Sequence, residues 1–315
     1  MNFATITITA ILIMLGASSV VINIMNGRLS REVGYFGASF VFLLIGAMVL
    51  LVLILLNPRQ SGLVRIGAVP PYLFIPAVVN LAMIAWICLS YVWYGAVVTA
   101  TISFLGQIVA GAVLDHIGFL ELPVIKLDPA RITGILLMFG GALLVQGLLH
   151  GKTTPPPLRP LQPHNQFSAA PGFRGAKFAC PFFLGVAISL MITINASLGR
   201  YIGVLETAFL FLMPGAIMLF CYFRFHPRES VPILNKKIAP LYFIPGVVNI
   251  VVIGGLVKLV PLIGVSLATL SYFLGQSCIA LVLDHHAFLG LTQSKVTGAK
   301  VMGIFLMVMG WIVVS

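Results

Sequence analysis

Long apolar runs dominate this sequence, and each has the length that a helix needs to cross a bilayer. About 20 mostly apolar residues in helical form span about 30 Å of hydrocarbon. The first five runs lie near 3–24, 34–56, 71–92, 94–114 and 131–149. Five more lie near 180–198, 203–224, 240–259, 261–283 and 296–314. The sequence therefore predicts an all-α membrane protein with ten transmembrane helices.

The composition fits a lipid environment. Charged residues make up 8% of the chain, whereas soluble domains average about 25%. The net charge of +11 comes from residues between the apolar runs, which is typical of basic loops at a membrane surface and unlike a clustered nucleic-acid footprint. We expect the lipid bilayer as a partner and no nucleic acid. The four cysteines have no CxxC spacing, so we expect no metal site and no cofactor.

An internal repeat relates the two sets of runs. Shifting the chain by 169 residues aligns them without a gap. The segment "FLGQIVAGAVLDHIGFLEL" at 104–122 then meets "FLGQSCIALVLDHHAFLGL" at 273–291, and "NGRLSREVG" at 26–34 meets "NASLGRYIG" at 195–203. A single offset that aligns five predicted helices does not arise by chance, so we infer that the chain arose by duplication and fusion of one five-helix unit.

The repeat defines the domain organisation. We predict a first five-helix repeat over 1–149, a Pro-rich linker over 150–178 and a second five-helix repeat over 179–315. Because five is an odd number of spans, the second repeat would enter the membrane from the opposite side. Inverted repeats of this kind recur in secondary transporters, where the substrate binds near mid-membrane at the repeat interface.

This symmetry favours a transporter of a small molecule. The sequence contains no HExxH or GxSxG motif and no acidic cluster, so we do not expect an enzyme. The alternative is a non-transporting membrane accessory or partner protein. A fused pair already supplies both halves of a pseudo-dimer, so a monomer could be sufficient.

The matched motifs resemble those of a known family. They are Asn-x-x-Leu after the first and sixth runs, Gly-Gln and Leu-Asp-His in the fourth and ninth, and a basic residue followed by Gly in the fifth and tenth. The chain resembles the YdcZ-like family of the drug/metabolite transporter superfamily, in its fused two-domain form. The resemblance implies a multi-pass protein of the bacterial inner membrane. It also implies an exporter whose substrate the family does not define. It also implies a central cavity lined by helices one to four and six to nine.

One departure from the wider superfamily concerns proton coupling. Small multidrug resistance relatives carry an essential glutamate in helix one, and neither equivalent run here contains a carboxylate. Glu206 is the acid that falls most clearly inside a span, and we take it as the candidate for proton coupling.

Polar and aromatic residues within the runs are the candidates for the substrate cavity, because polar groups in hydrocarbon are costly and usually have a partner or a function. The alternative for the amides is structural hydrogen bonding between helices, and for the aromatic residues an interfacial belt. These cavity candidates are Asn80, Asn249, Gln107, Gln276, Trp93 and Tyr94.

Residues near the predicted helix ends are candidates for an interface or a gate. The alternative for each is helix capping, solvation or headgroup contact. This set consists of Asn26, Asn195, Arg31, Arg200, Asp115, His116, Asp284 and His285.

The distribution of basic residues predicts the orientation. With both termini outside and the linker in the cytoplasm, most of the 18 Lys and Arg residues lie on the cytoplasmic side, as the positive-inside rule requires. Ten-helix members of the superfamily usually have the opposite orientation. We follow the charge distribution.

Overall fold

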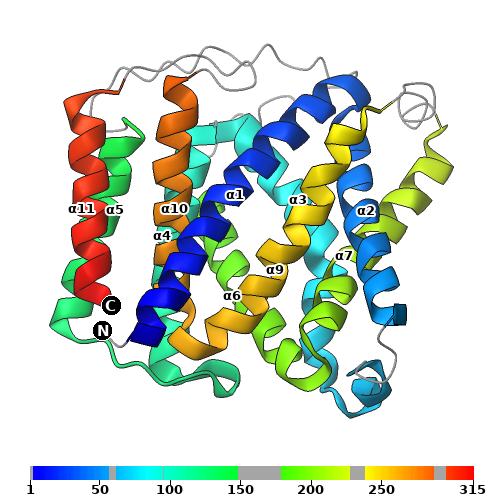
Figure 1. Ribbon diagram of the computed structural model, residues 1–315, viewed down its shortest axis with the longest axis horizontal. Coiled ribbons are helices and arrows are strands. Elements are labelled where there is room, and N and C mark those ends of the chain that lie inside the picture. Colours follow the sequence, from blue (N-terminus) through cyan, green and yellow to red (C-terminus); the bar gives the residue numbers. More distant parts are fainter. Residues whose placement is uncertain (1–2, 57–61, 95, 148–178, 228–237, 287–295) are drawn as a thin grey trace.

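Ten long α-helices make up the part of the chain that the computed structural model describes, which is residues 3–56, 62–94, 96–147, 179–227, 238–286 and 296–315 (Figure 1). The first half contains α1 (Phe3–Val33), α2 (Tyr35–Leu56), α3 (Ile75–Tyr94), α4 (Ala96–Ile117) and α5 (Pro129–Val145). The second contains α6 (Ala179–Ile202), α7 (Val204–Phe225), α9 (Ile244–Ile263), α10 (Val265–His285) and α11 (Gly298–Val314). The predicted linker, 150–178, lies outside the described residues.

Short 3-10 helices accompany these elements. They are η2 (Gly62–Ala68), η3 (Pro71–Phe74), η4 (Phe119–Glu121) and η6 (Pro240–Phe243). The matched helices η3 and η6 each begin at a proline and lead directly into α3 and α9. Proline suits this position because a first helical turn leaves its backbone N–H groups unpaired in any case.

Seven of the described helices are long and apolar enough to cross a membrane. They cover Phe3–Val33, Tyr35–Leu56, Val98–Ile117, Ala179–Ile202, Val204–Phe225, Pro240–Ile263 and Val265–His285. Pro71–Asn80, Pro129–Val145 and Gly298–Val314 are apolar but shorter. The chain is therefore an all-helical, multi-pass membrane protein.

The first helix extends further than the sequence predicted. We expected a break after residue 24, but α1 continues to Val33 and includes Asn26 and Arg31. Likewise α6 continues to Ile202, beyond its predicted end at 198. Each helix ends at a matched glycine with positive φ, Gly34 (φ 79°) and Gly203 (φ 96°). Glycine adopts this backbone conformation without steric cost, so each helix can end at its glycine. The polar residues before the glycine therefore lie within the helix.

Helices of each half pack closely against helices of the other half. Helix α1 packs along α10, and α6 packs along α4. Four matched glycines lie at these contacts, namely Gly16 and Gly275 between α1 and α10, and Gly106 and Gly185 between α4 and α6. A Cβ at any of them would overlap a backbone carbonyl of the facing helix. Small residues let membrane helices approach this closely, so these backbones touch.

Reciprocal contacts relate the two repeats about a common axis. Gly46 faces Leu212, and their equivalents Leu43 and Gly215 face each other in turn. On the axis, Phe104 stacks on its own equivalent, Phe273, with ring centroids 3.4 Å apart. When two residues are in contact and their equivalents are in contact as well, the interface has two-fold symmetry. The two halves therefore pack as a pseudo-dimer within one chain.

Helices α5 and α11 form a separate pair at one side of the molecule (Figure 1). Gly134 faces Gly310, whereas Gly141 faces Gly303. The order of these contacts shows that the two equivalent helices run antiparallel. The start of α1 and the end of α11 lie at the same end of the molecule, the lower end in the view of Figure 1.

Candidate functional site

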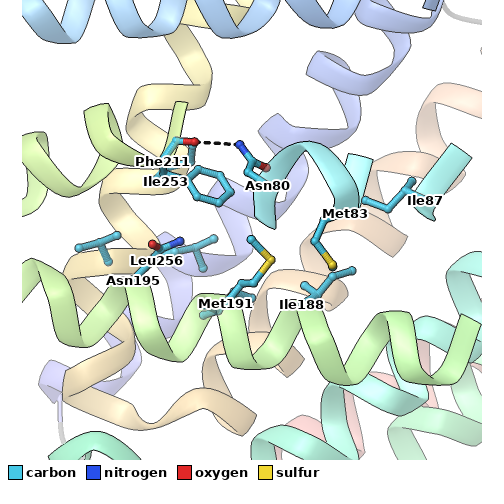
Figure 2. Close-up of a pocket in the computed structure, with 11 residues that line it drawn as sticks. Asn80, Met83, Ile87, Ile188, Met191, Asn195, Phe211, Ile253 and Leu256 are labelled. Atoms are coloured by element: carbon cyan, nitrogen blue, oxygen red, sulfur yellow. Dashed lines mark hydrogen bonds between the residues drawn. The ribbon is translucent and has the colours of Figure 1, made fainter. Parts of the chain in front are cut away.

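A cavity of about 170 Å³ lies among four helices taken from both repeats (Figure 2). Its walls come from α3 of the first repeat and from α6, α7 and α9 of the second. The side chains that line it are Asn80, Met83, Ile87, Ile188, Met191, Ile192, Asn195, Phe211, Ile253, Leu256 and Val257. We expected a polar cavity, but nine of these eleven residues are apolar.

Asn80 connects the first repeat to the second at the cavity wall. Its side-chain amide donates a hydrogen bond of 2.8 Å to the backbone oxygen of Phe211 on α7 (Figure 2). The residue is buried, and a buried amide needs such a partner in an apolar surrounding. One amide hydrogen is thereby committed to holding α3 against α7.

Asn195 is the second polar residue of the cavity, and its environment differs. It lies on α6, is 8% exposed, and forms no side-chain hydrogen bond with any residue that the structure describes. The sequence placed Asn195 at a helix end as a gate candidate. Because α6 continues to Ile202, its amide instead lies within the helix, at the cavity wall (Figure 2).

The other amides predicted for the cavity lie elsewhere among the described residues. Asn249 is half-buried on α9 and lines neither of the two described cavities. Gln276 donates to the Ser19 hydroxyl at 2.9 Å, across the α1–α10 contact. Gln107 is half-buried at the α4–α6 contact, where its backbone oxygen accepts from the Ser189 hydroxyl at 2.8 Å. Both glutamines therefore lie at contacts between the two halves, Gln276 at the α1–α10 contact and Gln107 at the α4–α6 contact.

The aromatic candidates mark the end of α3. Trp93 is 44% exposed and packs edge to face with Tyr94, with ring centroids 6.3 Å apart. Neither is among the residues that line the two described cavities. Their position matches an interfacial aromatic pair.

Arg200 fastens the C-terminal end of α6 to the turn that follows α4. Its guanidinium donates to the backbone oxygens of Leu120 at 2.6 Å and Glu121 at 3.1 Å. Both acceptor residues have positive φ, 55° and 61°, which is strained for residues with a Cβ. The arginine thus stabilises a turn that the backbone alone disfavours.

Glu206 fastens the same end of the molecule to a second segment. It is buried in the first turn of α7, and its Oε1 accepts a hydrogen bond of 3.0 Å from the backbone N–H of Gly62 in η2. Arg200 and Glu206 flank Gly203, where α6 turns into α7. We refer to these two residues with their backbone partners as the α6–α7 latch.

The gate candidates of the first repeat do not repeat this arrangement. Arg31 is exposed. Asn26, the equivalent of Asn195, is half-buried, and its Oδ1 has no hydrogen-bond partner among the described residues. The residue equivalent to Glu206 is Gly37. The two halves of the pseudo-dimer therefore differ at equivalent positions.

Asp115 connects α4 to the start of α10. Its Oδ1 accepts from the Val265 backbone N–H at 2.6 Å, and its Oδ2 accepts from the backbone N–H and hydroxyl of Ser266 at 2.9 and 2.5 Å. The Arg131 guanidinium donates to the same hydroxyl at 3.2 Å. A carboxylate at a helix N-terminus satisfies unpaired N–H groups and the helix dipole. Asp115 is fully buried, so it is not a solvated helix end.

The remaining helix-end candidates are more accessible. His116 is exposed, and its Nδ1 accepts from the Leu127 backbone N–H at 3.3 Å. Asp284, the equivalent of Asp115, is half-buried and interacts electrostatically with Lys300. His285 is exposed beside His286.

Sequence analysis missed several residues that matter to the site. Met83 and Met191 shape the cavity, and Phe211 supplies a backbone acceptor. Ser266 completes the Asp115 cluster and has a valine at the equivalent position of the first repeat. An ordinary serine or methionine in an apolar run gives no signal before its neighbours are known.

The fold and the site define a class of protein, namely a multi-pass membrane protein built from two equivalent halves with a cavity between helices of both. The model of the family described as "Putative inner membrane exporter, YdcZ" matches residues 7–144 and 177–313. The chain belongs to this YdcZ family of the drug/metabolite transporter superfamily, in a two-repeat form, and to the inner membrane.

Solved structures share this fold. One, titled only "Crystal structure of protein", aligns over 100% of this chain and 97% of its own, with a TM-score of 0.65 and 15% sequence identity. At that identity the likeness shows the fold alone. No curated protein matches the chain.

Proposed function

We propose that the chain exports a small molecule by alternating access between two inverted-topology repeats of five transmembrane helices. The observation that carries the proposal is the cavity at Asn80 and Asn195, which lies where α3 of one repeat meets α6, α7 and α9 of the other. Transporters with inverted repeats place their substrate site at such a junction.

The proposed topology needs ten spans. Helices α5 and α11 have 17 residues each, which gives about 26 Å of helix, close to the hydrocarbon thickness of about 30 Å. Helix α3 has 20 residues. Two features support an inverted arrangement with an even number of spans. Helices α5 and α11 pair antiparallel, and the start of α1 and the end of α11 lie at the same end of the molecule (Figure 1).

The difference between the halves supports alternating access. In the second repeat, the α6–α7 latch lies five residues beyond Asn195 along α6, which is about 7.5 Å. At the equivalent positions the first repeat has Arg31, for which no such backbone bonds occur among the described residues, and Gly37. We propose that the latch closes one end of the cavity, and that its release belongs to the opposite access state.

Efflux from proteoliposomes tests the proposed function. Liposomes containing the protein are loaded with an isotope-labelled extract of bacterial small molecules, and the released components are measured against protein-free liposomes. We expect saturable release of at least one component. Met191→Trp, which fills the cavity, should abolish that release, and Asn23→Trp, at an exposed position on α1, should preserve it.

Two results would contradict this proposal. Absence of protein-dependent efflux for every component would favour a non-transporting accessory protein. Equal efflux from the Met191→Trp variant would show that transport does not use this cavity.

A further inference from the structure

The polar side chains of the cavity lining are two asparagines, and one of them already donates to the protein. Of the two asparagines in its lining, Asn80 donates to Phe211 at 2.8 Å. Asn195 is 8% exposed and has no hydrogen-bond partner among the described residues. Its amide borders the cavity and is not among the fully buried side-chain atoms that lack a partner, so it is accessible to a molecule inside the cavity. The position therefore suits a ligand that brings one complementary hydrogen-bonding group.

The apolar part of the cavity suits a compact, polarisable body. Met83, Met191 and Phe211 contribute to its walls, together with isoleucines from three helices. Methionine adapts to irregular shapes and makes favourable sulfur contacts with aromatic rings. A cavity of about 150 Å³ holds a benzene molecule, and this one is of similar size, about 170 Å³.

The charge of the side chains that line the cavity is the third property that restricts the ligand. Among the described residues that line it, none is Lys, Arg, Asp or Glu, although the chain carries a net charge of +11. An ion that enters an apolar site without a counter-charge loses its hydration with no replacement. The site therefore disfavours anions and cations alike.

We infer that the cavity binds a small uncharged molecule with an aromatic body and a single hydroxyl group, which exchanges hydrogen bonds with the Asn195 amide. A hydroxyl both donates and accepts, as does an amide, so one head group satisfies the asparagine. This inference rests on the proposed function, since it names the substrate class of the same cavity.

Three probes that share a phenyl ring and differ in their polar group test the inference. They are 2-phenylethanol, which is neutral, phenylacetate, which is an anion, and 2-phenylethylamine, which is a cation at neutral pH. Binding of tritiated 2-phenylethanol to the full chain in lipid nanodiscs is measured with and without excess unlabelled probe, which subtracts partition into lipid. We expect saturable binding, with the two charged probes at least about tenfold weaker as competitors.

Substitution of the asparagine separates its role from general packing. Asn195→Ala should weaken the binding of 2-phenylethanol by about three- to tenfold, which corresponds to the loss of one hydrogen bond. Asn23→Ala, at an exposed asparagine on α1, should leave it unchanged. The probe comparison on the unmodified chain stands even if a variant folds poorly.

The outcomes distinguish this inference from the proposed function. Binding of 2-phenylethanol that depends on Asn195, in a protein without efflux activity, would support the ligand class and contradict transport. Efflux of charged solutes together with tighter binding of a charged probe would support transport and overturn the ligand class. No saturable binding of any probe would also overturn it, and would leave Asn195 to be hydrated by water.

Discussion

At the scale of single residues, the few buried polar side chains join elements that are far apart in sequence. Asn80 joins α3 to α7, Glu206 joins α7 to η2, and Asp115 joins α4 to α10. In each case a side chain bonds a backbone group of another element. Such bonds in an apolar surrounding fix geometry as well as stability.

The Asp115 cluster should contribute measurably to stability. Asp115→Ala leaves two backbone N–H groups of α10 uncapped and removes the carboxylate near the Arg131 guanidinium. We expect a loss of about 2 kcal/mol in the free energy of unfolding. Thermal unfolding in detergent measures it, with His116→Ala at the exposed neighbour as the control. An unchanged unfolding temperature in Asp115→Ala would show that the cap is dispensable.

Glu206 has two separable roles, in the latch and in proton coupling. Glu206→Gln keeps an oxygen that can accept from the Gly62 N–H but cannot exchange a proton. If Glu206 couples proton movement to transport, this variant should fold normally and lose efflux driven by a pH gradient. Glu206→Leu should also lose the latch. Full pH-driven efflux in Glu206→Gln would remove this residue from coupling.

At the scale of helices, close approach across the pseudo-dimer decides which helices can pair. Gly185 on α6 faces the backbone of Ser103 on α4, where an added Cβ would overlap the Ser103 carbonyl. Backbones do not move aside as a flexible side chain does. Glycine at such a contact therefore outweighs its low helix propensity.

Enlarging Gly185 should separate α4 from α6. We expect Gly185→Ala to lower the free energy of unfolding by about 1–3 kcal/mol, since overpacking has costs of this size. Gly140→Ala on α5, where nothing lies within 4 Å of the added Cβ, should be neutral or slightly stabilising. Unfolding temperatures and monodisperse yields of the two variants provide the comparison. Equal behaviour would mean that the α4–α6 contact relaxes freely.

The sequence predicted the helices far better than their contacts. Apolar length and the 169-residue offset identify α1 to α11, and Gly34 and Gly203 could have indicated the true ends of α1 and α6. The offset shows which residues are equivalent, but not that α1 packs on α10. Asn80 was predicted to line the substrate cavity, and it does line a cavity. Its hydrogen-bond acceptor could not be predicted, because it is a backbone oxygen, which every residue carries.

At the scale of the whole molecule, symmetry and asymmetry coexist. The axis at Phe104 and Phe273 joins equivalent residues. The cavity, in contrast, is lined by one helix of the first half and three of the second, and Gly37 stands in the first half where the second has Glu206. A fused duplication permits this, because each copy can change independently. The second half can therefore contribute more of the cavity lining than the first, while both halves take part in the reciprocal packing.

The charge distribution predicts how the molecule lies in the membrane. We expect both termini outside the cytoplasm, because this orientation puts most of the 18 Lys and Arg residues inside. Alkaline phosphatase fused after Ser315 should be active, and a cytoplasmic fluorescent reporter at the same site should be dark. The reverse pattern would show that the usual superfamily orientation prevails over the charges.

The packing of first-half helices against second-half helices has a consequence for biogenesis. The ribosome delivers α1 and α4 to the membrane before α10 and α6 have been made. Until then, the glycine faces at Gly16 and Gly106 have only lipid against them, although the finished protein covers both with backbone. The α4–α6 and α1–α10 contacts can therefore form only after the corresponding helices of the second half have been made and inserted.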